Sequence, residues 1–369
     1  MKKNFQKVLI VIVIIFSIIV ISKSNMLNQE KSHYKFEKAI VKNINEEKME
    51  EDNIIEDLYL GYQQIEIEIV TGKYTGETFN IKNPINRLYN IHTEIDDKII
   101  VNIEEENNDI KSISVYNHQK EQVVYILIGG FFILLILLSG WKGVKAVLSL
   151  IFTGIMIIFF MIPMLFKGHQ PIPLTIITVA ITTIVTLLLI DKPSKKTLSA
   201  ILGTIIGVII AGIISYVSSN IANISGLTSN EAEGLIYIAE HRNVQISGLT
   251  FSAILIASLG AIMDVAMSIA SSVFEIDKNN PKIISKELFK SGMNIGKDIM
   301  GTMSNTLILA FAGSSLNIIL FMAAYEMPYR QVVNLNFLVS EVIQGISGSI
   351  GIILTVPITA FISSYLAKK

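Results

Sequence analysis

Cysteine is absent from this chain of 369 residues, and charged residues make up only 17% of it. Without thiols the protein has no disulfide framework, thiolate zinc site, iron–sulfur cluster or cysteine nucleophile. Soluble domains average about 25% charged residues, so the low charge and the 51% of hydrophobic residues indicate a membrane protein. The 30 basic and 31 acidic residues nearly balance and form no basic block, so we expect no nucleic-acid partner.

Long apolar runs recur along the chain, each near the roughly 20 residues that a membrane-spanning helix needs. Eight runs are predicted to span a lipid bilayer, which makes the fold class a polytopic, all-α helix bundle. These runs are residues 8–22, 123–140, 146–166, 172–190, 198–219, 249–274, 302–324 and 340–366.

The first run, residues 8–22, is short and follows Lys2, Lys3 and Lys7, as the apolar core of a signal peptide would. No small-x-small cleavage site follows it, since the next residues are Lys23, Ser24 and Asn25. We therefore expect residues 1–22 to stay on the protein as a membrane anchor helix, with removal as the alternative.

Residues 23–122 differ from the rest of the chain. They hold 20 of the 31 acidic residues and contain no run long enough to cross a bilayer. Alternating apolar and polar residues at 62–70, and strand-like runs at 77–81, 98–103 and 112–116, predict a small antiparallel β-barrel or sandwich. The charged residues 46–57 are expected to form a solvated helix or linker. The domains are then the anchor 1–22, a β-rich domain 23–122 and a seven-span domain 123–369.

The lysines predict the orientation, because positively charged loops stay in the cytoplasm. If the N-terminus is cytoplasmic, 15 lysines lie on the cytoplasmic side, while the short loops on the other side carry only Lys167, Arg242 and Arg330. Both termini are therefore predicted to be cytoplasmic and residues 23–122 extracytoplasmic.

Ionisable residues within a spanning helix are costly, and they mark candidate functional sites. Asp264 lies near the middle of run 249–274, and Ser268 and Ser271 follow at i+4 and i+7 on the same helix face. Gly260, one turn earlier, allows close approach by a neighbouring helix. We expect a proton- or ion-binding role for this face, and the alternative is a carboxyl that only hydrogen-bonds another helix.

A second polar face, Asp298, Thr302, Asn305 and Thr306, leads into run 302–324 and is expected to meet the Asp264 face. The alternative is an ordinary first turn in which Asp298 complements the helix dipole.

The third candidate lies in the last run, where Glu341, Gly345 and Gly348 follow helical spacing. Several glycines and Pro357 are expected to weaken this helix and expose backbone groups to a substrate or ion, with tight helix packing as the alternative. In run 198–219, Gly203, Gly207 and Ala211 recur every four residues and predict a packing face.

An enzymatic function is not expected. The motif GISG at 345–348 places Ser347 as in rhomboid-type proteases, but a serine nucleophile needs a base. All five histidines lie outside the predicted spans. We expect no catalytic residue, metal or cofactor.

Three segments resemble the hallmark blocks of the YibE/F family of bacterial multipass membrane proteins. They are GAIMDVAMSIAS (260–271), SGMNIGKDIMGTMSNTLILAFAG (291–313) and SEVIQGISGSIGIILTVPIT (340–359). The resemblance extends over about residues 60–366 and implies a place in the bacterial cytoplasmic membrane, without implying an activity.

A second likeness, to the resistance-nodulation-division permeases and their SecD/SecF relatives, rests on Asp264 followed by Asn305 and Thr306. It implies ion-coupled transport. We therefore expect a proton-coupled transporter of an unknown small solute or ion, with the lipid bilayer as its surroundings. The alternative is a non-transporting accessory or scaffold that assists other membrane or exported proteins, with a second copy or another membrane protein as its partner.

Overall fold

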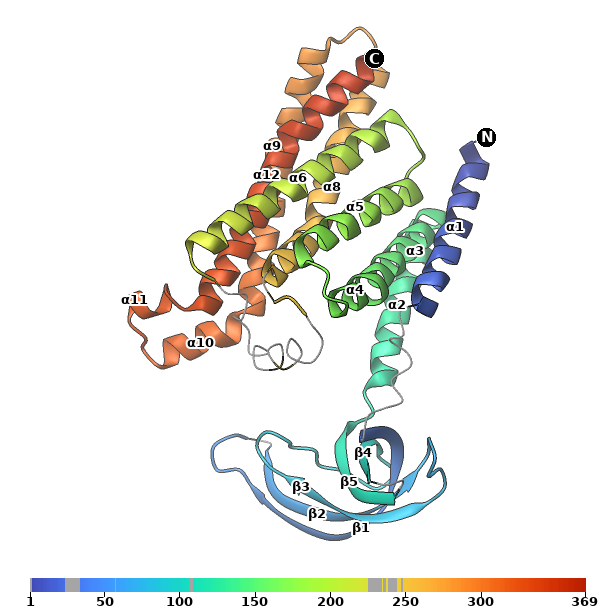
Figure 1. Cartoon of the computed structure of the whole chain (residues 1–369), viewed down its shortest axis with the longest axis vertical. Helices are drawn as coiled ribbons and strands as arrows, with labels where there is room; N and C mark the ends of the chain where they lie inside the picture. The colour runs from blue at the N-terminus through green and yellow to red at the C-terminus, as the bar shows by residue number, and fades with distance from the viewer. Residues whose placement is uncertain are drawn as a thin grey trace. The chain divides into compact units, whose positions relative to one another are not determined.

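The computed structural model describes residues 2–23, 34–56, 58–106, 109–224, 234, 237, 244–246 and 248–369. Arg242, used in the lysine and arginine count, and residues 24–33 of the β-rich domain lie outside the described residues. The chain divides into two compact units (Figure 1), one of residues 28–137 and one of residues 1–27 and 138–369. Each is described by itself.

The smaller unit holds one curled antiparallel sheet with strand order β3-β2-β1-β4-β5 (Figure 1). Its core consists of alternate residues on the strands, such as Ile65 and Ile67, whose side chains are fully buried. The predicted strand-like runs 62–70, 77–81, 98–103 and 112–116 are confirmed as parts of β2 to β5, which extend by up to four residues beyond a run, and only Val70 and Glu77 lie just outside a strand. The strands are β1 (Tyr34–Glu51), β2 (Tyr59–Ile69), β3 (Thr78–Ile85), β4 (Lys98–Glu106) and β5 (Asp109–His118).

Strand β1 corrects one prediction. Residues 46–51, expected in a solvated helix or linker, form its last part and pair with β2, with Glu46 opposite Gln64 and Glu51 opposite Tyr59. Their charged side chains are mostly exposed, so backbone hydrogen bonds to β2, rather than burial of side chains, hold this part of the strand in the sheet. Helix α2 (Glu121–Ser139) follows β5, and Lys38 of β1 forms an ion pair with Glu121 in its first turn.

The larger unit is helical. The predicted apolar run 123–140 corresponds to α2, and each of the remaining seven predicted runs lies in one or more helices of the larger unit. Among the described residues, six helices are long and apolar enough to cross a membrane, with α2 as one of them and α3, η1 and α4 together as another. The number is seven if the bent pair α9 and α10 forms one span. The apolar part of α1, Val8–Lys23, is shorter. The helices are α1 (Lys2–Lys23), α3 (Trp141–Ile155), the π-helical η1 (Met156–Met161), α4 (Ile162–Phe166), α5 (Pro171–Ile190), α6 (Lys195–Ile221), α8 (Leu249–Asn279), α9 (Ser285–Ser314), α10 (Leu316–Ala324), α11 (Tyr329–Val332) and α12 (Asn336–Lys368).

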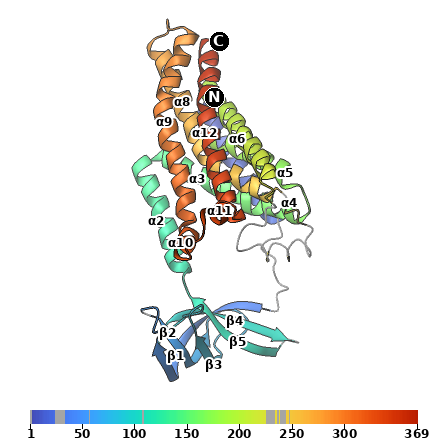
Figure 2. The ribbon, with the colours of Figure 1, turned by 90° about the vertical axis from the view of Figure 1, so that its left-hand side faces the viewer.

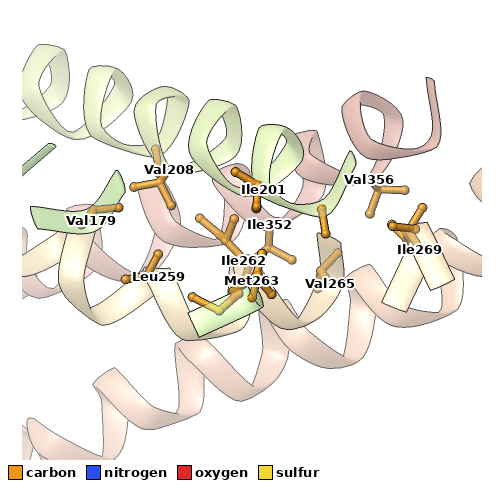
Figure 3. Packing of buried hydrophobic residues seen from close by; sticks show 14 of the residues in the cluster. Val179, Ile201, Val208, Leu259, Ile262, Met263, Val265, Ile269, Ile352 and Val356 are labelled. Carbon is orange, nitrogen blue, oxygen red and sulfur yellow. The ribbon is translucent and has the colours of Figure 1, made fainter. Parts of the chain in front are cut away.

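Helices α6, α8 and α12 form the centre of this unit. The side chains of Ile262 on α8 and Ile352 on α12 are fully buried between them and lie close together in Figure 3. Helix α1 joins the unit at another place, where Val13 packs against Phe152 and Met156.

The predicted packing face of α6 is confirmed. Its small residues lie against α12, with Gly203 at Thr359 and Gly207 at Thr355, so closely that an added Cβ would overlap the threonine Oγ1 atoms. Ala211 likewise touches Gly351 of α12. Small residues bring the two backbones together, as is usual for helices packed in membranes.

Helix α12 corrects a second prediction. It runs from Asn336 to Lys368 as one helix that includes Pro357, so the expected interruption is not there. The break lies instead in the preceding element, where α9 and α10 meet at Ser315 with a bend of 58°. Helices α9 and α12 lie side by side in both views (Figures 1 and 2) and are in extensive contact.

Candidate functional site

Asp264 lies on the side of α8 that faces away from the helical core. Its neighbours Met263 and Val265 are buried, whereas Asp264 and Ser268 are exposed. Helical geometry explains this, because Ile262, Ala266 and Ile269 occupy the opposite face of α8 and fill the core. In the single chain, the face of α8 that carries Asp264 and Ser268 therefore points away from the helical core.

The second polar face is also exposed. Asp298, Thr302, Asn305 and Thr306 lie on the side of α9 away from Gly292 and Gly296, which pack against α8 and α12. The Thr302 and Thr306 hydroxyls donate to carbonyls of their own helix, at Ile299 and Thr302. Within the described part of the chain, no hydrogen bond or ion pair joins these residues to Asp264, so the structure does not bring the two faces together.

Glu341 stands in a different environment. It lies in the second turn of α12 and is half-buried, and its carboxyl group lies beside Ser315 at the break between α9 and α10. Ser315 is 97% buried, since only 3% of its surface is exposed. Glu341 Oε2 and Ser315 Oγ are both enclosed. The Ser315 hydroxyl interacts with the Glu341 carboxyl, and neither atom has another hydrogen-bond partner among the described residues.

At this break the C-terminus of α9 meets the N-terminus of α10, with Ser315 between them. The Ser315 N–H donates to the carbonyl of Phe311 as α9 ends, and the last carbonyls of a helix carry a partial negative charge. A carboxylate and a helix C-terminus in one place suit a proton or a small cation rather than an anion.

Gly345 and Gly348 are buried in α12 and have a packing role. A Cβ added at Gly348 would lie 2.7 Å from Leu307 of α9, and one at Gly345 would lie 3.6 Å from Phe311. Both glycines therefore bring α9 close to α12 near Glu341, as the packing alternative expected.

Ser271 lines an open cleft of about 750 Å³ at the end of α8. Acidic and basic side chains alternate around it and form the ion pairs Lys196–Asp191 and Lys278–Glu275. Because the charges compensate one another, this cleft selects no ion of either sign.

Sequence reasoning missed two groups of polar residues. Ser315 gave no signal, because only the bend buries it. Thr182, Thr183 and Thr186 of α5 are more than 90% buried, and their hydroxyls have no partner among the described residues. The run of threonines at helical spacing in residues 171–190 was a visible signal for a polar stripe inside the bundle.

These features define the class: a helical membrane protein with six or seven apolar helices that can span a bilayer and a separate curled antiparallel sheet. The family model described as YibE/F-like protein matches residues 127–369, about two thirds of the chain, and the chain belongs to this family. The residues of the sheet are not part of the matched range. Comparison with curated proteins and with solved structures finds no match.

Proposed function

We propose that this protein is an ion-coupled membrane transporter and that Glu341 binds the coupling ion. The observation that carries the proposal is the enclosed carboxyl oxygen of Glu341 beside the Ser315 hydroxyl at the break between α9 and α10. Broken helices that hold a carboxyl group inside a membrane are the usual construction of ion sites in secondary transporters.

The coupling ion is proposed to be a proton. Glu341 has no lysine or arginine partner within the described part of the chain, so a bound proton can neutralise it while the solute moves. Asp264 is a second proposed titrating group, with Ser268 beside it. A charged carboxylate is costly in hydrocarbon, so Asp264 on the outer face needs either a proton or a covering partner.

The test uses the purified full chain in vesicles and records currents on a solid-supported membrane while candidate solutes and pH gradients are applied. Glu341→Gln keeps the shape of the side chain but cannot titrate, so we expect the solute-dependent current to fall to that of protein-free vesicles. Asp264→Asn is expected to do the same, and Asp298→Asn to weaken the current less. Glu326→Gln, which changes an exposed carboxyl, is the control. A full current from Glu341→Gln would overturn the proposal.

The membrane arrangement that we propose has eight spans, formed by α1, the bent pair α9–α10 and the six long apolar helices. It places the protein in the bacterial cytoplasmic membrane, with the sheet outside and both termini inside. We further propose that the sheet is barrel-like in solution, supported by contacts between β3 and β5, the strands at the two ends of its order.

A second candidate function is that of a non-transporting accessory or scaffold. It is favoured by the outer face of α8, where Ala257, Gly260, Asp264 and Ser268 are all exposed. Small residues beside one polar group suit a contact with another helix in a membrane.

The absence of cysteine allows a clean test of this second function. Ala257→Cys should form a disulfide-linked dimer, or an adduct with one partner, in native membranes. Ile213→Cys on the exposed side of α6 should not. Cross-linking by both variants, or by neither, would leave the scaffold function without support.

A further inference from the structure

Three lysines share one face of the first half of α9. Lys286, Lys290 and Lys297 are spaced at i, i+4 and i+11, so they lie within a narrow stripe about 16 Å long. All three are exposed. They line a shallow cleft of about 580 Å³ together with Ile284, Glu287, Phe289, Met293 and Asn294.

These lysines are unpaired. None of the three makes an ion pair or hydrogen bond within the described part of the chain. By contrast, Lys196, Lys278 and Lys368 each form an ion pair with a carboxylate, at Asp191, Glu275 and Asp277. The only acidic residue in the lining is Glu287, so the cleft keeps a positive charge.

The same cleft offers apolar surface. Ile284 is 58% exposed, and Phe289 and Met293 are half-buried beside the lysines. In the membrane arrangement proposed above, the cleft precedes the apolar part of the α9–α10 element, expected from Thr302 onward, and is therefore placed near the lipid headgroups. Cations next to apolar side chains at that depth match an amphipathic anion better than a free one.

We propose that this face of α9 binds an anionic phospholipid, whose phosphate is attracted by the positive charge of Lys286, Lys290 and Lys297 and whose acyl chain lies against Phe289 and Met293. The inference does not depend on the transport proposal, because it concerns a different part of α9 and needs no transported solute. Juxtamembrane lysine clusters attract anionic lipids in this way, and the attraction weakens with salt.

The test is native mass spectrometry of the full chain in neutral detergent, with phosphatidylglycerol or phosphatidylcholine added in equal amounts. We expect the protein to retain more phosphatidylglycerol. The triple variant Lys286→Gln/Lys290→Gln/Lys297→Gln should retain no more phosphatidylglycerol than phosphatidylcholine, while a triple variant with arginine at the same three positions should keep the preference.

The matched control changes three exposed lysines of the same predicted side, as Lys142→Gln/Lys192→Gln/Lys195→Gln, and should retain the lipid like the unchanged protein. Thermal unfolding in the same detergent verifies that all variants fold. Equal retention by the two glutamine triples would overturn the proposal. So would displacement of the lipid by inorganic phosphate at the lipid's own concentration, because that result would indicate a site for a free anion.

Discussion

Two carboxyl groups of this protein, those of Asp52 and Glu341, have different hydrogen-bonding surroundings. Asp52, at the end of β1, is buried against Arg87, whose guanidinium donates to both carboxylate oxygens. The backbone N–H groups of Ile54 and Ile55 also donate to Asp52. Glu341, by contrast, has one enclosed oxygen beside the Ser315 hydroxyl and no ion-pair partner among the described residues. The first arrangement holds a charge in place, and the second leaves room for a proton.

The first prediction concerns the pH dependence of the sheet. The hydrogen bonds from Arg87 lower the pKa of Asp52 from 3.8 to about 2. Because the folded-state pKa is the lower one, the pair stabilises the fold fully above pH 3.8, and this stability is lost as the pH falls toward about 2. Asp52→Asn should therefore destabilise the sheet at pH 6 and much less at pH 2.

The measurement is urea unfolding, followed by circular dichroism, of a fragment comprising residues 34–118, whose hydrophobic core comes from these residues alone. Glu56→Gln, which changes an exposed carboxyl nearby, should leave the pH dependence unaltered. A difference between the unchanged fragment and Asp52→Asn that stays constant from pH 6 to pH 2 would contradict the assignment.

At the scale of elements, the α6–α12 contact shows how small residues replace large ones in a membrane core. Gly207 leaves room for Thr355, whose hydroxyl is tied to the Gly351 carbonyl of its own helix and cannot move aside freely. Packing of this closeness predicts sensitivity to a single methyl group.

We therefore predict that Gly207→Ala lowers the free energy of unfolding by about 1–3 kcal/mol, the usual effect of overpacking. Thermal unfolding in mild detergent measures it. Gly154→Ala in α3 is the matched control, because nothing lies within 4 Å of its added Cβ. Adding Thr355→Ala to Gly207→Ala removes the overlapping oxygen and should restore part of the stability. An unchanged melting temperature for Gly207→Ala alone would refute the packing argument.

Strand β1 shows what local patterns miss. Strands β2 and β4 alternate clearly and were predictable, because each has one buried face. The second half of β1 is a run of charged residues without such a face, and only its pairing with β2 makes it a strand. Register between strands is a non-local property, so no window along the chain contains it.

For the whole molecule, the distribution of lysine sets the expected orientation in the membrane. We predict that the sheet is outside and both termini are inside. Leu88→Cys, at a position 88% exposed in the sheet unit, should react with a membrane-impermeant maleimide in intact spheroplasts. Lys369→Cys at the C-terminus should react only after lysis. Reaction of Lys369→Cys in intact spheroplasts would contradict the prediction that the C-terminus is cytoplasmic.

The membrane class, the positions of the apolar helical runs, the four alternating strands and the family were predictable from the amino-acid sequence alone, because these depend on composition, periodicity and motifs that lie close together along the chain. The family match to residues 127–369 confirms the resemblance seen in three short blocks. The packing face of α6 was equally readable from its four-residue spacing.

Only the tertiary structure decided which polar residues face inward. The sequence marked Asp264 as a polar position within a span but not the side it faces, and it lies on the outer face of α8, while Ser315 is enclosed and gave no signal. The continuity of α12 through Pro357 and the bend at Ser315 were also beyond the sequence. The physical reason is that every face of a membrane helix is apolar enough to be buried, so hydropathy cannot tell the core from the lipid. Contacts between helices far apart in the chain make that choice.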